Sequence, residues 1–399
     1  EGIAAGPDPL EAPVPVTRRL LRSRLADLDG PGRSLVVAVG GAVVPLDEVE
    51  ACDLADVDPD DEAPAAPWTH AGQARVAIDP ERGRLVLPVG TAEPVTVSWY
   101  RGFPSTIGGG GYDRDAASDA SGRPGEPADP LRLVPGDRPD LATALADLAV
   151  PPAPGEPAGA AGTVELTGNA RHATPAALVA TGDERLVVRS SAHSQAVLDL
   201  GGDLEVGGGD SAELTLDGLL LVGGRVLVPA QVGGETNRLQ TLRLVHCTLV
   251  PGGTRTRHGG PGPQATSIEV EAPGVEVVLE RCVTGAVRAV ERSSVTVVDG
   301  IVDALSPTAV ACAGLDGEAT GGDLSLRAAT VVGKVHAARI DALDSILLAA
   351  RATDGSDTWA APVVARRRQS GAVRHCWVPL DAITPRRFAC LPPPPERAI

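Results

Sequence analysis

The sequence predicts an all-β protein whose larger part is a parallel β-solenoid. Three observations lead to this prediction: a five-residue unit that recurs along the second half of the chain, short strand-like runs before each unit, and variable spacing between units. A single coil of such a fold cannot bury its own interior, so neighbouring coils stack and share one core.

The repeated unit has a small residue at its third position. In chain order it reads LDGLL, VHCTL, ERCVT, VDGIV, RAATV, LDSIL and RHCWV, and the small residues are Gly218, Cys247, Cys282, Gly300, Ala329, Ser345 and Cys376. We expect these residues to stack in one column at a sharp corner, where a large side chain would push the coils apart. Cysteine serves there as a small hydrophobe.

The runs before the units, such as AELTL, VEVVL and GDLSL, alternate as strands with one buried face do. The variable spacing indicates loops that point outward from the coils. A β-sandwich is the alternative fold. Sparse hairpin signals after Val164 and the constant internal order of the unit count against it.

The remaining chain divides by composition. Residues 1–107 are predicted to form a small β-rich region, because Val-rich runs flank Gly40-Gly41 and the DPERG turn at 79–83, as in hairpins. Residues 108–139 are rich in Gly, Pro and Asp and predict a connector. Its GGGG stretch at 108–111 predicts a flexible linker, since a phosphate loop would continue with Lys-Ser or Lys-Thr.

A capping helix followed by the β-helix is predicted for residues 140–378, and a closing segment for residues 379–399. Asp140 is the expected N-cap of the helix, which has Leu141, Leu145 and Leu148 on one face.

Composition excludes several classes of function. The net charge of −17 and the single lysine, Lys334, argue against nucleic-acid binding. The sequence has no apolar run of membrane-spanning length and no basic start followed by an apolar run, so we expect a cytoplasmic or particle-associated protein. Six cysteines without a C-x-x-C pair predict free thiols, with no metal site and no cofactor.

The segment DLATALADLAVPPAPGEPAGAAGTVELTGNARH combines a short helix with a first strand. It resembles the N-terminal beginning of pectate-lyase-like right-handed parallel β-helix proteins, in which a helix covers the edge of the first coil. The resemblance implies a right-handed solenoid capped by residues 140–150.

A second resemblance covers most of the chain. It is carried by ACDLADVD, ARVAIDPERGRLVLPVG, VSWYRGFPSTIGGGGYDR, LRLVHCTLVPGG, ATVVGKVHA, LDSIL and RRRQSGAVRHCWVPLDAITPRRFACLP, in this order. These stretches are similar to uncharacterised bacterial proteins that accompany contractile, phage-tail-like injection particles. The tail departs from that group at Ala372, where a cysteine is usual, and at His375, where an aromatic residue is usual. The group has no known activity that the resemblance could transfer to this chain.

An enzyme is the alternative, because right-handed β-helices often carry polysaccharide lyases and hydrolases. Such enzymes need paired carboxylates, or a calcium site with a basic residue. Residues near the bends supply candidates, although solvent-facing solenoid positions have the same spacing; they are Asp299, Asp303, Asp341, Asp344, Arg281, Arg327 and Arg374. Polygalacturonase motifs are missing from the sequence, and no aromatic residue occurs between Asp113 and Thr358 to contact sugar rings. We therefore predict no catalytic residues.

The predicted function is a non-enzymatic structural or accessory component of a contractile phage-tail-like particle, with the β-helix as a rigid arm that binds protein subunits. The basic tail is the candidate docking segment, because opposite charges steer assembly; its residues are Arg366, Arg367, Arg368, Arg386 and Arg387. The alternatives are a polysaccharide-binding or polysaccharide-cleaving β-helix protein and a trimeric, tail-spike-like homo-oligomer.

Overall fold

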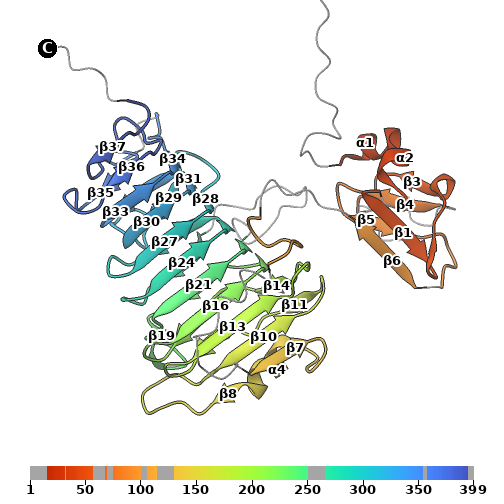
Figure 1. Ribbon diagram of the computed structural model, residues 1–399, viewed down its shortest axis with the longest axis horizontal. Helices are drawn as coiled ribbons and strands as arrows, with labels where there is room; N and C mark the ends of the chain where they lie inside the picture. The colour runs from red at the N-terminus through yellow and green to blue at the C-terminus, as the bar shows by residue number, and fades with distance from the viewer. Residues whose placement is uncertain are drawn as a thin grey trace, which may run out of the picture. The chain divides into compact units, whose positions relative to one another are not determined.

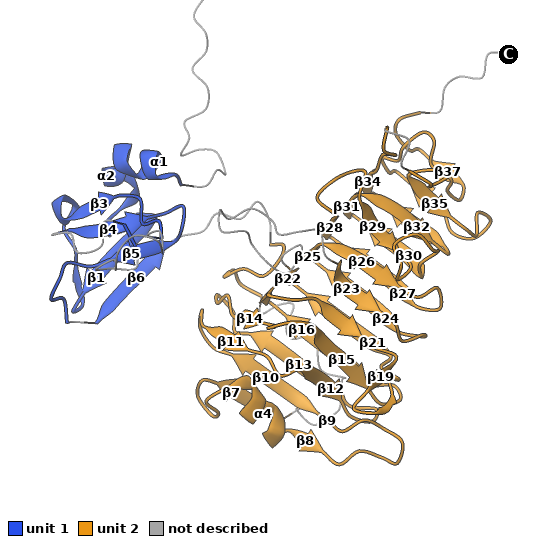
Figure 2. Ribbon diagram, turned by 180° about the vertical axis from the view of Figure 1, so that it is seen from behind, with its two compact units in different colours: residues 1–105 blue, residues 106–399 orange. Residues whose placement is uncertain are grey.

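The protein is described by a computed structural model that covers residues 16–31, 33–56, 68–69, 75–92, 94–99, 106–114, 130–249, 266–353 and 357–393. The chain divides into two compact units, residues 1–105 and residues 106–399 (Figure 2). Each unit has its own hydrophobic core.

Unit 1 combines short helices with two small sheets. The helices are α1 (Arg18–Ser23), α2 (Leu25–Leu28) and the 3-10 turn η1 (Leu46–Glu48). One sheet has the order β2 (Ala42–Val43), β1 (Leu35–Val39), β6 (Val95–Trp99), and the other β3 (Val49–Ala51), β4 (Val76–Asp79), β5 (Arg84–Val86). The β1–β2 and β4–β5 hairpins lie where the sequence predicts them. Leu21 and Leu28 bury the apolar sides of the helices in this core.

Unit 2 is a right-handed parallel β-helix (Figure 1), so the predicted fold class is confirmed. Its 11-stranded sheet has the order β7 (Leu131–Val134), β10 (Gly162–Leu166), β13 (Arg185–Ser190), β16 (Glu213–Asp217), β21 (Thr241–Val245), β24 (Glu276–Glu280), β27 (Ser294–Val298), β30 (Asp323–Arg327), β33 (Ile340–Leu343), β36 (Val373–Arg374), β37 (Arg387–Phe388). Successive strands pair in parallel, one per coil.

Two further sheets complete the coils. The 8-stranded sheet has the order β11 (Arg171–Ala173), β14 (Val197–Asp199), β17 (Leu220–Val222), β22 (Thr248–Leu249), β25 (Val283–Thr284), β28 (Ile301–Asp303), β31 (Thr330–Val332), β34 (Ile346–Leu348). The 10-stranded sheet has the order β8 (Ala149–Val150), β9 (Gly159–Ala160), β12 (Ala177–Ala180), β15 (Leu204–Gly208), β18 (Val226–Val228), β23 (Thr266–Val270), β26 (Ala286–Ala289), β29 (Val310–Ala313), β32 (Lys334–Ala337), β35 (Val363–Ala365). A small hairpin, β19 (Gln231–Val232) and β20 (Glu235–Thr236), projects from one coil.

A left-handed residue marks the corner between the 11-stranded and 8-stranded sheets. In successive coils it is Gly218, His246, Arg281, Asp299, Ala328, Asp344 and His375, each with φ between 49° and 71°. The residue after it is buried, and these inward residues form a column: Leu219, Cys247, Cys282, Gly300, Ala329, Ser345 and Cys376. Six of the seven predicted residues therefore share one column. Gly218 lies one position earlier, because in that coil the glycine itself takes the left-handed conformation.

Polar side chains link the column from coil to coil. The backbone N–H of Cys247 donates to Cys282 Sγ at 3.4 Å, and that of Ala329 donates to Ser345 Oγ at 3.1 Å. Ser345 N–H donates in turn to Cys376 Sγ at 3.4 Å. Burial raises the pKa of the Cys247 thiol, so it stays protonated and donates to the Leu216 carbonyl. The corner thus satisfies buried N–H groups with side chains of the next coil.

The solenoid is longer than predicted. Strand β7 lies within the stretch expected to be a connector, and it pairs with β10. At the other end β37 pairs with β36, and Trp377 forms a bridge with Leu391, so stacking continues past Val378. Flanking prolines and the shortness of these strands hide them in the sequence.

The predicted capping helix is α4 (Leu141–Asp147), at the N-terminal end of the coils (Figure 1). Asp140 accepts a hydrogen bond from Thr143 N–H at 2.7 Å, as an N-cap does. Leu141 and Ala144 are buried against the aliphatic core of the coils.

Replacing Gly300 by Leu is expected to destabilise unit 2 by roughly 1–3 kcal/mol through overpacking. Even a Cβ at Gly300 would lie 3.0 Å from Val297 Cγ1 and 3.1 Å from the Cys282 carbonyl oxygen. Chemical denaturation would measure the change, with exposed Arg292→Leu in the same coil as control. Equal stability of the two variants would contradict the packed column.

Candidate functional site

Residues 106–114, here called the strap, lie on the corner and on the 8-stranded sheet. Gly108 N–H donates to the Arg281 carbonyl at 2.7 Å, and Gly109 N–H donates to Thr248 Oγ1 at 2.9 Å. A Cβ at Gly109 would collide with the Leu219 carbonyl. The prediction of a flexible linker at residues 108–111 is therefore wrong, because these glycines serve close approach of two backbones.

Arg114 anchors the strap in the coils. Its side chain is 2% exposed and donates to backbone carbonyls, at 2.7 Å from Ser191 and 3.1 Å from Ser194. Tyr112 Oη lies 2.7 Å from His246 Nδ1, and burial lowers the pKa of His246 to about 4. Burial likewise raises the pKa of Asp217 to about 6. These groups form a closed contact rather than an open binding site.

A groove of about 700 Å³ lies beside β26, β29 and β32. Arg288 and Lys334 line it from these strands, and the loops at 303–309, 316–318 and 357–359 flank it. A groove of this size can hold a small ligand. Two features of the sequence could have indicated the groove. They are the single lysine, Lys334, and Trp359, which is the first aromatic residue after Tyr112.

Lys334 and Trp359, which both line the groove, contact each other. Lys334 Nζ lies 2.9 Å from Asp357 Oδ2, with both side chains less than a tenth exposed. Nζ also lies 4.8 Å from the centroid of the Trp359 ring. Trp359 is itself only 9% exposed, so its face is not available to stack on a sugar ring.

The groove carboxylates cap backbone turns. Asp316 Oδ1 accepts hydrogen bonds from the N–H groups of Ala319 and Glu318, which lower the pKa of Asp316. Burial acts to raise the pKa of Asp357, but hydrogen bonds from Lys334 and two backbone N–H groups outweigh it and lower the pKa. Asp303 accepts from Leu305 N–H at 2.7 Å. A glycosidase acid needs a raised pKa, which is the opposite of Asp316 and Asp357.

Arg288 is also held by the fold. Its guanidinium donates to the carbonyls of Val287 at 3.1 Å, Val310 at 3.2 Å and Ala311 at 3.4 Å. Burial lowers the pKa of Arg288 below its usual value. The side chain therefore ties β26 to β29 beneath the groove.

The catalytic candidates suggested by the sequence do not meet in one groove. Of them only Asp303 lines the groove. Asp299 and Asp344 occupy left-handed corner positions, and Asp344 lies 3.3 Å from His375. Asp341 pairs with Arg339 at 2.9 Å. Within the described ranges, no group of three or more His, Cys, Asp or Glu side chains is arranged to hold a metal ion.

The candidate docking arginines divide into two sets. Arg366 pairs with Glu291 through two hydrogen bonds, and Arg367 lies 3.7 Å from both Glu291 and Asp323. Arg387 is half-buried and donates to the Ala382 carbonyl at 2.6 Å. Arg368 and Arg386 are exposed. The first set thus stabilises this chain's own turns, and the second faces solvent.

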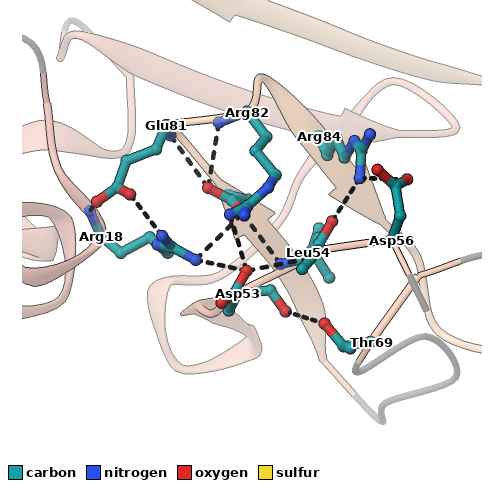
Figure 3. Close-up of polar contacts among 10 residues, drawn as sticks. Arg18, Asp53, Leu54, Asp56, Thr69, Glu81, Arg82 and Arg84 are labelled. Carbon is teal, nitrogen blue, oxygen red and sulfur yellow. Dashed lines mark hydrogen bonds and ion pairs between the residues drawn. The ribbon is translucent and has the colours of Figure 1, made fainter. Parts of the chain in front are cut away.

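Figure 3 shows a network of charged side chains in unit 1, formed by Arg18, Asp53 and Arg82, that no local sequence pattern indicated. These side chains surround Asp79, which is buried. Asp79 Oδ2 accepts from Leu54 N–H at 3.0 Å and lies 3.2 Å from Arg82 and 3.6 Å from Arg18. Both arginines also contact Asp53, at 2.8 Å and 2.5 Å. The network ties α1 to the β4–β5 hairpin. Its only sequence signal is the DPERG turn, which predicts a hairpin equally well.

Comparison of the chain with protein-family models, with curated proteins and with solved structures found no match. Among the helices that the structure describes, none is long and apolar enough to cross a membrane.

Replacing Asp79 by Asn is expected to lower the stability of unit 1 by roughly 1–3 kcal/mol, because two arginines lose a buried partner. Burial acts to raise the pKa of Asp79, but its hydrogen bonds and Arg18 lower it overall. A lowered pKa means that the stabilisation is present above about pH 4 and is lost as the pH falls through the folded-state pKa.

Hydrogen exchange of the β4 amides in the full chain would measure the effect of Asp79→Asn. The wild type should lose protection in acid, and the variant should already have reduced protection at neutral pH. Unchanged protection in the variant at pH 7 would show that the network adds no stability.

Replacing Arg114 by Met is expected to lower the free energy of unfolding of unit 2 by about 2 kcal/mol, since several buried carbonyls lose their donor. Limited proteolysis should then cut the strap faster. The exposed Arg292→Met is the control. A strap that resists protease equally in both variants would exclude the anchoring role of Arg114.

Proposed function

We propose that this chain is a non-enzymatic structural component of a larger protein assembly, with the β-helix as a rigid arm. The main support for this proposal is the distribution of exposed apolar side chains. Six of the nine large ones among the described residues of unit 2 belong to the last coils: Ile346, Leu348, Trp377, Leu380, Phe388 and Leu391. Apolar surface gathered in one place is typical of a contact with another protein.

Rigidity supports the same role. The coils share one aliphatic core, and side-chain hydrogen bonds along the corner column join neighbouring coils. The strap adds a second connection across the strands, through Gly109 and Arg114. A solenoid of this kind transmits position along its length rather than closing around a substrate.

The particular assembly that we propose is a contractile, phage-tail-like particle. This part of the proposal depends on the resemblance carried by the ordered sequence stretches from ACDLADVD to RRFACLP.

A polysaccharide-binding or polysaccharide-cleaving protein is the second candidate, favoured by the groove beside β26, β29 and β32. The covered face of Trp359 and the lowered pKa values of Asp316 and Asp357 weigh against it. A panel of acidic polysaccharides would test it, and release of unsaturated or reducing ends would replace the structural proposal with an enzymatic one.

We expect the native protein to sediment with a megadalton particle when gently lysed cells are separated on a density gradient and fractions are probed for this chain. Migration as a free small species would contradict the assembly role. Light scattering of the purified protein would then distinguish a monomer from a tail-spike-like trimer.

A further inference from the structure

We infer that the outer face of the 8-stranded sheet in the last coils is a docking surface for an extended segment of another protein, one that carries apolar and acidic side chains. The inference rests on the proposed function and names the surface and the partner chemistry that the assembly would use. Figure 1 shows these coils, with β34, β36 and β37, at the end of the solenoid opposite α4.

An apolar row forms the centre of the surface. Ile346, Trp377 and Leu391 occupy the same register position in three successive coils, joined by parallel bridges. They are 43%, 38% and 61% exposed. Leu348 lies two residues beyond Ile346 on the same face and is 39% exposed. This row belongs to one sheet face, so a single extended chain could contact all of it.

The strap shows how an extended polypeptide can bind this sheet face. Following the row back along the sheet leads through Thr330, Ile301 and Val283 to Thr248. There the chain's own strap covers it: Gly109 N–H donates to Thr248 Oγ1, and a Cβ at Gly108 would meet both Thr248 and Val283. The same outer face thus already binds one extended polypeptide at its middle. Among the described residues, the row is partly exposed at Val283, Ile301 and Thr330 and exposed at Ile346, Trp377 and Leu391.

The arginines beside the apolar row favour a partner segment with acidic side chains. Residues 366–391 contain six arginines, of which Arg366, Arg367 and Arg387 contact acidic side chains or a carbonyl of this chain. The other three, Arg368, Arg374 and Arg386, are exposed. Arg386 lies 4.9 Å and Arg374 5.8 Å from the centroid of the Phe388 ring, beside the corner that leads to the apolar row. A basic rim favours an acidic partner segment and opposes the same face of a second copy.

The test uses the full-length protein and a short fluorescent peptide that alternates Leu and Glu, measured by anisotropy. We expect binding that weakens with added salt. Trp377→Ser combined with Leu391→Ser should weaken it by roughly tenfold or more, and so should Arg386→Glu. The matched controls are Leu315→Ser and Arg292→Glu, at exposed positions away from the row. All variants change exposed side chains, and circular dichroism would verify their folding.

Each other result overturns the inference. Equal binding of a peptide that alternates Leu and Lys would remove the charge argument. Failure of the Leu-Glu peptide to bind at millimolar concentration, or protection of Trp377 from acrylamide quenching, would show that the face is not a free docking surface. Self-association that Trp377→Ser abolishes would assign the face to a second copy.

The density gradient separates this inference from the proposed function. If the wild type migrates with the particle and the Trp377→Ser, Leu391→Ser variant migrates free, both stand. If both proteins migrate with the particle, the assembly role stands and this docking surface is wrong. If the wild type migrates free, the proposed function fails first.

Discussion

The left-handed residue at the corner between the 11-stranded and 8-stranded sheets is the constraint on which the rest of unit 2 depends. It recurs at one register position, from Gly218 to His375. A non-glycine residue in this conformation costs roughly 1–2 kcal/mol. Stacking offsets this cost, because the next residue enters a buried column in which Cys and Ser side chains accept hydrogen bonds from the preceding coil. From Gly218 onward this corner has a constant length, and the length varies in the other two turns, where the groove loops lie.

The sequence predicted the parts of the fold that repeat with a constant local pattern. Alternating runs and small residues identified the coils and six of the seven column positions. The predicted column was wrong at Gly218. Glycine suits both a small inward position and a left-handed corner, and residue type alone cannot separate the two. The strap was missed for a related reason. Gly108 to Gly111 have the composition of a flexible linker, but here they allow backbone contact with Thr248 and Leu219.

The groove and the Asp79 network could not be predicted because their members come from distant positions. Arg288, Asp316, Lys334 and Asp357 belong to different coils, and loop lengths decide whether they meet. The partners of Asp79 likewise come from α1 and from the segment after β3. No local spacing encodes either arrangement. The aromatic-free middle of the chain also suggested a surface without aromatic contacts, whereas Trp359 folds back onto Lys334.

The two ends of the solenoid differ in how far their terminal coils are covered by the rest of the described chain. A terminal coil leaves apolar surface and unpaired strand edges, which favour association with another chain. At the beginning, α4 covers the first coils with Leu141 and Ala144. Among the described residues at the other end, β37 is the last strand of its sheet, and Trp377 and Leu391 remain exposed. The exposed Arg368, Arg374 and Arg386 follow in the same part of unit 2. The net charge of −17 of the whole chain opposes non-specific contacts. A partner that binds at the last coils would therefore cover the exposed apolar side chains and the strand edge that the fold itself leaves uncovered among the described residues.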